Sequence, residues 1–359
     1  MLHRPLRLPD NRVPVYYEGG AGIDRFRGEL GGGQSGPEDW VASLCRLPTS
    51  IVGADAPPDA GLSKTLDGTT LIDLVQGDPA GWLGGALAGR YGGDSGLLVK
   101  LLDAGERLPV HCHPTRSFGA DHLGSLFGKT EGWIIMDAAA GARVWLGMCD
   151  DIDVATLRRW IEHQDATSML AAMNEIEVTA GQVVFVPAGL PHSIGPGVML
   201  TELQEPTSFS VLAEYEVFGL DDQQATLGLG WDVALECFDL GGYKGDRLAE
   251  LLPQRTEWSM QPGGTIFDLF PLAADEFFSA RLVRCTGTVE LTEPSFAVLV
   301  ITDGFGTLRW EGGHEPVKRG ETWVVPYSAG TTNFAGDVEA IVCMPPNADD
   351  SDRSDRTRR

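Results

Sequence analysis

Four residues of this chain have the types and the spacing of a metal site. His111 and His113 stand one residue apart in LPVHCHP, Glu131 follows in GKTEGW, and His192 comes later in FVPAGLPHSIG. On a β-strand, residues i and i+2 point to the same side, so the first two histidines would present their imidazoles to one point while Cys112 faces away. Three nitrogens and one carboxylate oxygen suit a catalytic Zn²⁺ with one open position.

Mn²⁺, Co²⁺ and Fe²⁺ are alternatives to Zn²⁺, because they accept the same kinds of ligand. A second alternative is that these histidines are ordinary buried or surface residues. The chain has only seven histidines, however, and three of them fall in the two histidine motifs. The sequence therefore favours a metal site.

The composition indicates a β-rich protein. The 359 residues are enough for two cores or one large core, since single cores stop growing at about 250–300 residues. Gly (46) and Pro (22) are plentiful, and short apolar runs end in turn signals, which is typical of sandwiches and barrels. We expect two β-rich lobes.

The charge and the termini exclude several classes of partner. The 51 acidic and 27 basic residues give a formal net charge of -24, which repels nucleic acid and anionic membranes. No secretion signal and no stretch of about 18 apolar residues is present. The six cysteines are scattered without CxxC spacing, as expected for small buried hydrophobic residues. We predict a soluble cytoplasmic protein that binds neither nucleic acid nor membranes.

The ligands fall in segments with a strand pattern. SGLLVKLLDAGERLPVHCHP predicts two strands around a turn at residues 104–107, and TEGWIIMDAAAGARVWLGM predicts a hairpin that turns near residues 140–141. The last ligand follows an apolar strand and a turn with Pro187 and Gly189. This turn would deliver the His192 side chain into the mouth of a barrel.

Helical periodicity is confined to short segments. Residues 151–175 have a helical pattern in which Asp153 can cap the first turn and apolar residues recur three and four apart. Shorter helices are expected at residues 70–82 and near 246–252. Because the longest segment interrupts a β pattern, we interpret it as an insertion between strands.

The C-terminal third repeats the first lobe in outline. Four half-buried strands are predicted there, at residues 277–285, 296–302, 306–310 and 322–326. KRGETWVVPYSAGTTNF restates AGQVVFVPAGLPHSIG, with Gly320, Pro326 and Gly330 at matching places. Residues 331–333 stand where the histidine would fall, so this copy has lost its metal ligand.

These motifs resemble the class I mannose-6-phosphate isomerases, zinc enzymes of the cupin superfamily. The segments EDWVAS, LLVKLLDA, HxHP, GKTEGWIIMDA, PAGxxHxIGxG with LTELQ, and KRGETWVVP occur in the order of the family. The resemblance implies two cupin-type jelly-roll barrels with a helical insertion in the first. Residues 1–253 would form the metal-binding cupin, residues 254–346 a degenerate cupin lobe, and residues 347–359 a disordered tail.

The resemblance also implies a ligand set and a reaction. The family pattern of Gln-x-His, Glu and His falls on His111, His113, Glu131 and His192, with one departure: an imidazole at position 111 replaces a neutral oxygen ligand. The implied reaction interconverts mannose 6-phosphate and fructose 6-phosphate through a cis-enediol. A metal near the sugar oxygens can stabilise the negative charge that develops in this reaction.

A side chain must move the proton between C1 and C2. Glu202, on the strand after the His192 loop, is our candidate, although it could instead orient a ligand. Lys129 matches a substrate-contacting lysine of the family and would stabilise charge, or it is a surface cation at a turn. Lys100 also matches a polar position near the metal, although its long stem could snorkel. We expect Lys100 and Arg116 to contact the substrate.

Two departures concern the phosphate of the substrate. Pro109 stands where the family usually has a serine that helps to hold the phosphate, and no Lys or Arg occurs between Arg159 and Lys244, where the family places an arginine. Arg116 and Lys129 are the remaining nearby cations. The alternatives are an isomerase or epimerase of a different, unphosphorylated sugar and a non-catalytic sugar-binding cupin. The partner is a small sugar or sugar phosphate, and the sequence leaves the oligomeric state open.

Overall fold

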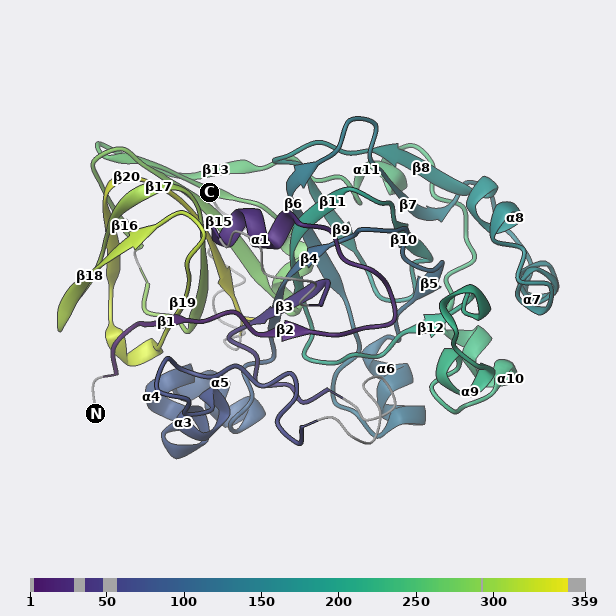
Figure 1. The fold of residues 1–359 in the computed structure, drawn as a ribbon, viewed down its shortest axis with the longest axis horizontal. Coiled ribbons are helices and arrows are strands. Elements are labelled where there is room, and N and C mark those ends of the chain that lie inside the picture. Colours follow the sequence, from purple (N-terminus) through teal and green to yellow (C-terminus); the bar gives the residue numbers. More distant parts are fainter. Residues whose placement is uncertain (1–2, 29–35, 48–56, 292, 348–359) are drawn as a thin grey trace.

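The computed structural model describes residues 3–28, 36–47, 57–291 and 293–347. In this part of the chain, twenty strands form sheets of nine, six and five strands. Figure 1 shows two β regions: the nine-stranded sheet lies at one end of the elongated molecule, and the two smaller sheets lie at the other. The prediction of a mostly β protein is confirmed.

The strands of each sheet come mainly from one part of the chain. The nine-stranded sheet contains β1 (Leu6–Leu8), β13 (Thr256–Gln261), β14 (Gly264–Asp268), β15 (Ser279–Cys285), β16 (Thr288–Leu291), β17 (Ala297–Trp310), β18 (Gly313–Lys318), β19 (Thr322–Val325) and β20 (Thr332–Met344). The six-stranded sheet contains β2 (Arg12–Val13), β3 (Glu38–Val41), β4 (Leu98–Asp103), β6 (Glu131–Ala138), β9 (Val183–Val186) and β11 (Val198–Gln204). The five-stranded sheet contains β5 (His111–Cys112), β7 (Arg143–Met148), β8 (Met173–Glu177), β10 (His192–Ile194) and β12 (Val211–Leu212).

The helices are short and lie in the connections between strands. The α-helices are α1 (Gly22–Arg27), α3 (Leu71–Gly77), α4 (Pro79–Leu83), α5 (Gly85–Tyr91), α6 (Arg116–Phe118), α7 (Val154–Glu162), α8 (Ala166–Ala171), α9 (Asp222–Ala225), α10 (Trp231–Ala234) and α11 (Asp246–Ala249). Other helical turns are η1 (Gly119–Leu123), η2 (Glu216–Phe218), η3 (Leu235–Cys237), η4 (Leu272–Glu276) and η5 (Tyr327–Ala329).

The two predicted strand pairs, at residues 98–113 and 131–148, are wrong in their pairing. β4 and β5 are consecutive but lie in different sheets, and so do β6 and β7. β6 pairs with β9 and β11, whereas β7 pairs with β8 and β10. Side chains of β6 and β7, such as Trp133 and Leu146, pack in one hydrophobic cluster. Both strands bury an apolar face against the opposite sheet. The chain therefore passes from one sheet to the other at the turn, and the two strands do not pair with each other.

The helical segment does separate two paired strands, but it forms two helices. α7 and α8 lie between β7 and β8, which pair with each other. Asp153 caps α7 by accepting a hydrogen bond from the Thr156 amide at 2.7 Å. The helix stops before Gln164, whose φ of 46° is left-handed, and Asp165 caps α8. The last residues of the predicted helix form β8 instead.

The C-terminal copy has longer strands than predicted. The two strands expected at 296–302 and 306–310 are one 14-residue strand, β17, which contains a bulge between Ile301 and Asp303. Gly304 follows the bulge with a φ of 73°, so the DG pair marks a bulge and not a turn. Gly181 and Gly320, which the predicted repeat aligns, have similar φ values of 89° and 88° just before β9 and β19.

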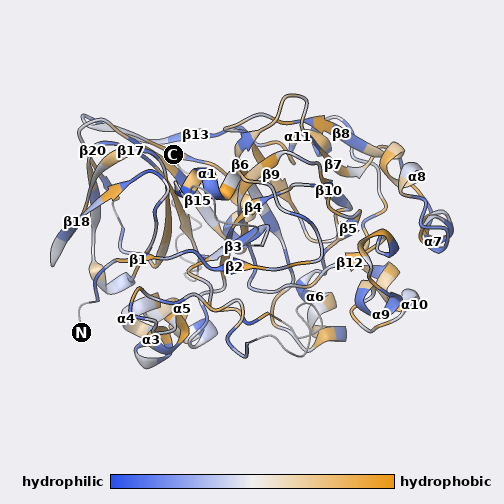
Figure 2. Ribbon diagram, viewed as in Figure 1, coloured by the Kyte–Doolittle hydropathy of each residue, from blue (hydrophilic) through white to orange (hydrophobic). Residues whose placement is uncertain are grey.

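The two β regions share a hydrophobic core. One cluster of buried residues includes Leu101, Phe185 and Leu203 from the first region together with Phe278 and Val298 from the second. In Figure 2 hydrophobic colouring concentrates on the central strands around β4, β6 and β9. Strand β6, which begins with Glu131 and contributes Ile134 to this cluster, therefore lies at the contact between the two regions.

No described helix has the length and the hydrophobicity that crossing a lipid bilayer requires. Residues 348–359 lie outside the described part of the chain, so the prediction of a disordered tail is not tested. The boundary between residues 253 and 254 also stays a prediction.

Candidate metal centre

Two paired strands bring the predicted histidines together. His111 begins β5, His192 begins β10, and these two residues are direct partners in the β5–β10 ladder. His113 follows β5, and its carbonyl accepts a hydrogen bond at 2.7 Å from the amide of Gly189 in the turn before β10. All three imidazoles are buried, and one ligating nitrogen from each lies within 4.8 Å of the others.

Backbone carbonyls orient the three rings. The Nδ1 atoms of His111, His113 and His192 lie 2.8 Å from the carbonyl oxygens of Pro109, Phe209 and Leu190, respectively. A carbonyl only accepts, so each Nδ1 is the donor, and each Nε2 keeps a lone pair. The Nε2 atoms of the second and third rings are buried without a hydrogen-bond partner among the described residues. Rings fixed in this way are typical of metal ligands.

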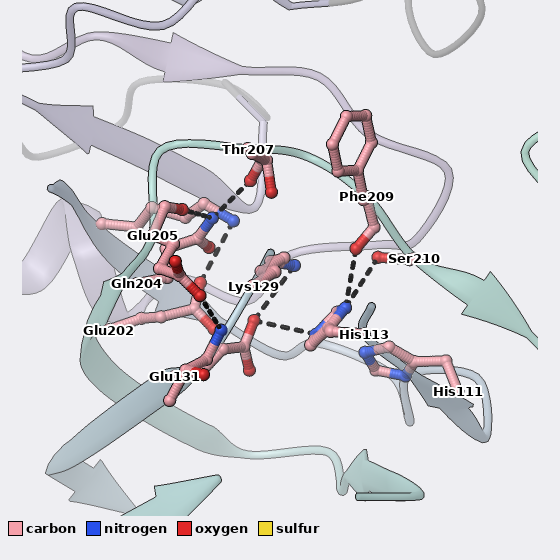
Figure 3. Close-up of polar contacts among 12 residues, drawn as sticks. His111, His113, Lys129, Glu131, Glu202, Gln204, Glu205, Thr207, Phe209 and Ser210 are labelled. Atoms are coloured by element: carbon pink, nitrogen blue, oxygen red, sulfur yellow. Dashed lines mark hydrogen bonds and ion pairs between the residues drawn. The ribbon is translucent and has the colours of Figure 1, made fainter. Parts of the chain in front are cut away.

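Glu131 faces two of these nitrogens. Its Oε1 atom lies 2.9 Å from His113 Nε2, and its Oε2 atom lies 3.6 Å from His192 Nε2. The carboxylate also contacts Lys129 Nζ at 3.0 Å (Figure 3). It accepts a hydrogen bond from Trp133 Nε1 at 3.1 Å. Since the imidazole nitrogens and the carboxylate all present lone pairs, they fit a shared cation.

The protonation states of these four side chains also suit a bound cation. Burial lowers the pKa of His113 to about 3, and burial also lowers the pKa values of His111 and His192. Burial raises the pKa of Glu131, but His113 and Lys129 outweigh burial and hold that pKa well below its usual range. At neutral pH the cluster therefore offers three neutral imidazoles and one carboxylate, which are the forms that bind a divalent metal.

A second charged cluster adjoins the first. Lys100 Nζ lies 3.1 Å from Glu202 and 3.3 Å from Glu38, and all three side chains are buried. Glu38 in turn accepts hydrogen bonds of 2.6 Å from Tyr17 and from Trp40. Neighbouring strands create this arrangement, because Lys100 on β4 is the direct partner of Trp40 on β3 and of Glu202 on β11.

Glu202 and Lys100 have perturbed acidity. Burial and the charge of Glu131 raise the pKa of Glu202 to about 7, although Lys100 and Lys129 oppose the shift. Burial lowers the pKa of Lys100, but Glu202 and Glu38 outweigh burial and raise that pKa above its usual range. A carboxyl group that titrates near neutrality is suited to moving a proton.

One cavity of about 60 Å³ joins the two clusters. Its lining includes the predicted residues His111, His192, Glu131, Lys129, Lys100 and Glu202. Arg116 is not in this lining. It instead forms ion pairs with Glu205 and Glu276, the second of these in the other β region. The structure thus brings together the predicted site residues except Arg116.

Sequence reasoning assigned no role to Glu38, Tyr16 or Tyr17, which also line the cavity. The signal for Glu38 is weak, because it is one acidic residue in the short segment EDWV. Its partner Lys100 stands some sixty positions later in an apolar run, and only strand pairing shows that the two residues meet.

Comparisons with known proteins agree with this architecture. A family model described as the mannose-6-phosphate isomerase cupin domain matches residues 270–345. Mannose-6-phosphate isomerase of Streptococcus mutans is 28% identical over 246 residues, which cover 68% of this chain and 72% of that protein. Mannose-6-phosphate isomerase ManA of Bacillus subtilis is 26% identical over 260 residues, which cover 71% of this chain and 77% of the relative.

Solved structures show the same fold. The mannose 6-phosphate isomerase structure from Bacillus subtilis matches with a TM-score of 0.75 and 21% identity, over 95% of this chain and 99% of that chain. A mannose 6-phosphate isomerase structure bound with zinc and yttrium matches with a TM-score of 0.71 and 13% identity, over 96% of this chain and all of the other. These matches define a mostly β, cupin-type fold. The chain is therefore similar to mannose-6-phosphate isomerases in its sequence and its fold, and residues 270–345 match the cupin domain of these enzymes.

Proposed function

We propose that this protein is a metal-dependent aldose–ketose isomerase that interconverts mannose 6-phosphate and fructose 6-phosphate. The observation that carries the proposal is the set of three buried imidazoles, two of which have Nε2 atoms 2.9 and 3.6 Å from Glu131, beside a cavity that Lys100, Lys129 and Glu202 line. The names of the related proteins support the same activity.

His111, His113, Glu131 and His192 would hold the metal, which we propose to be Zn²⁺, with Mn²⁺, Co²⁺ and Fe²⁺ as alternatives. A bound divalent cation supplies Lewis-acid stabilisation for negative charge on the sugar oxygens. The zinc in one similar structure supports this choice.

The protein's own groups would move the proton and hold the sugar. Glu202, with a pKa of about 7, would take the proton from C2 of the aldose and return it to C1 as the ketose forms. Lys129 Nζ, beside the ligand carboxylate, would stabilise charge on a substrate oxygen. Lys100 would hold Glu202 in place and contact the substrate. Arg116 would act only at the edge, because it does not line the cavity.

We further infer that both β regions are jelly-roll barrels, with residues 1–253 as the metal-binding lobe and residues 254–346 as the degenerate one. The separate hydrophobic clusters inside the two regions support this division. Matching glycine conformations before β9 and β19 support a common ancestry of the lobes.

The test is isomerisation in D₂O. Metal-loaded protein is incubated with mannose 6-phosphate or fructose 6-phosphate, and NMR follows both the product and the deuterium at C1 and C2. We expect interconversion with deuterium at C1 of the ketose. If the protein contains metal and neither sugar phosphate reacts, the proposed activity is wrong; binding without turnover would then indicate a sugar-binding protein.

A further inference from the structure

A second cavity of about 530 Å³ lies beside the metal cavity. The two cavities share Tyr16, Ser208 and Ser210 in their linings. The rest of the second lining is mainly apolar or neutral, with residues such as Leu123, Phe209, Leu212, Leu220 and Gln223. Neither the metal cluster nor the Lys100 cluster uses this space.

Several residues that line the second cavity also contact or pair with the histidines of the metal cluster. Leu212 on β12 is the direct partner of His111 on β5, so the two side chains lie on the same face of the sheet. The Phe209 carbonyl orients His113, and Ser210 Oγ lies 3.3 Å from Nδ1 of the same ring (Figure 3). A sugar whose C1 and C2 lie at the metal cluster can therefore extend its far end into the second cavity.

Cations are scarce around both cavities. Among the described residues that line them, Lys100 and Lys129 are the only Lys or Arg, and both belong to the metal cavity. Each lysine already contacts buried carboxylates, at 3.1 and 3.3 Å for the first and 3.0 Å for the second. Among the described residues that line the second cavity, Asp221 is the one charged residue.

Two arginines outside both linings are engaged in ion pairs. Arg107 donates two hydrogen bonds of 2.6 Å to the buried carboxylate of Glu214, and Arg116 pairs with the buried Glu205. A phosphate dianion in the second cavity would therefore lose water without gaining a charged hydrogen bond in return. A hydroxymethyl group carries no such penalty there, since Ser208, Ser210 and Gln223 can exchange hydrogen bonds with it.

We propose that the second cavity receives the end of the sugar distant from C1 and C2, and that it suits a neutral, hydroxyl-bearing end, so that free aldoses are substrates comparable to their 6-phosphates. This inference rests on the proposed isomerase function. The reaction needs no co-reactant: the carbon-bound proton moves from C2 to C1, and a hydroxyl proton moves from O2 to O1.

The test compares kcat/KM for mannose with kcat/KM for mannose 6-phosphate on the same metal-loaded protein. We expect the phosphorylated sugar to exceed the free sugar by less than tenfold, and a ratio of tenfold or more overturns the inference. If neither sugar reacts, the proposed isomerase function fails. Calorimetry then measures Kd for mannitol and for mannitol 1-phosphate, and a tenfold or greater preference for the phosphorylated compound overturns the inference.

Adding a positive charge to the second cavity tests whether the far end of the sugar lies there. Leu212→Arg puts a guanidinium beside His111 on the cavity side, and we expect it to shift the kcat/KM ratio at least tenfold toward mannose 6-phosphate. Because Leu212 is buried, Gln223→Arg at the exposed rim of the cavity provides a second variant with the same expected direction. Val217→Arg adds the same charge at an exposed position outside both linings and should leave the ratio unchanged. Unchanged ratios in both cavity variants, or an equal shift in the Val217 variant, overturn the placement.

Discussion

Each of the three histidines is anchored by a main-chain carbonyl and not by a carboxylate. The carbonyls belong to Pro109, Leu190 and Phe209, which come from three different connections. A carbonyl cannot protonate, so the donor role of each Nδ1 is independent of pH. Pro109, a departure from the family pattern, therefore still has a structural task through its carbonyl oxygen.

We expect His192→Ala to lower metal affinity at least tenfold, because one of four buried ligands is lost and even indirect supports of a ligand are worth about 10–100-fold. Elemental analysis after dialysis against a weak chelator measures the bound metal, and circular dichroism checks the fold. His122→Ala removes an exposed histidine and is the matched control. Equal metal content in the two variants would remove His192 from the ligand set.

Glu202 should control the pH dependence of turnover. Burial and Glu131 raise its pKa to about 7, so the carboxyl is protonated below that pH and becomes a base above it. We expect kcat/KM to rise with pH through this region, with a midpoint below 7 when a bound cation favours the ionised form. Glu202→Gln should keep its metal and lose at least 100-fold in kcat, within the usual range for general acid–base catalysis. A variant with unchanged turnover would exclude Glu202 from proton transfer.

Glu38 should also tune the titration of Glu202. Its negative charge raises the pKa of Glu202, so Glu38→Gln is expected to move the midpoint of the pH profile to a lower value. Lys100 keeps its contact with Glu202, and we therefore expect a stability loss of only about 1–3 kcal/mol in urea unfolding. A lower melting temperature with an unmoved midpoint would show that Glu38 is structural alone.

At the level of elements, the turns decide where the ligands meet. The connection after β6 takes the chain to the opposite sheet, so Glu131 and His192 approach from different sheets across the core. The helices α7 and α8 lie between β7 and β8, away from the ligands. Their stability should therefore be separable from metal binding.

Removing the cap of α7 tests this separation. Asp153→Ala deletes the side chain that accepts from the Thr156 amide, and loss of an N-cap costs about 1 kcal/mol. Urea unfolding should show this loss, while metal content stays at the wild-type level. Val154→Ala, at a position that is 49% exposed, should change stability by less than about 0.5 kcal/mol. A loss of metal in the Asp153 variant would mean that the insertion supports the site.

At the level of the whole molecule, the C-terminal region packs directly against β6, the strand that begins with Glu131. A Cβ atom at Gly132, next to Glu131, would lie 2.5 Å from the ring of Phe270 and 2.8 Å from the ring of Phe278. Glycine thus permits the close approach of the two regions. The C-terminal region thus covers the strand that presents Glu131.

Arg116 should hold the two regions together. It pairs with the buried Glu205 in the first region and with Glu276 in the second, and it lies 4.6 Å from the ring of Phe277. Arg116→Ala leaves Glu205 without its cation, and we expect a loss of about 3 kcal/mol, at the low end for a broken buried pair because Arg116 is partly exposed. Urea unfolding measures the loss, and KM should change less than threefold. A large rise in KM with normal stability would return Arg116 to the substrate site.

The sequence by itself determined the chemistry of the site. The pair His111 and His113, with Glu131 and His192, supplies donor types that suit a metal wherever they meet, and their motifs indicated the resemblance to mannose-6-phosphate isomerases. Local patterns also determined most strands and the capped helix after Asp153, because capping and hydrophobic periodicity depend on neighbours in the chain.

Only the tertiary structure decided how these groups face one another. The turn after β6 has the same local chemistry whether the chain pairs back or crosses to the other sheet, so the hairpin prediction failed there. For the same reason the sequence could not show that Glu38 meets Lys100, that Arg116 joins the two regions, or that Leu212 stands beside His111. Each of these contacts joins strands or loops far apart in the chain, and burial of the shared core, not local preference, sets their pairing.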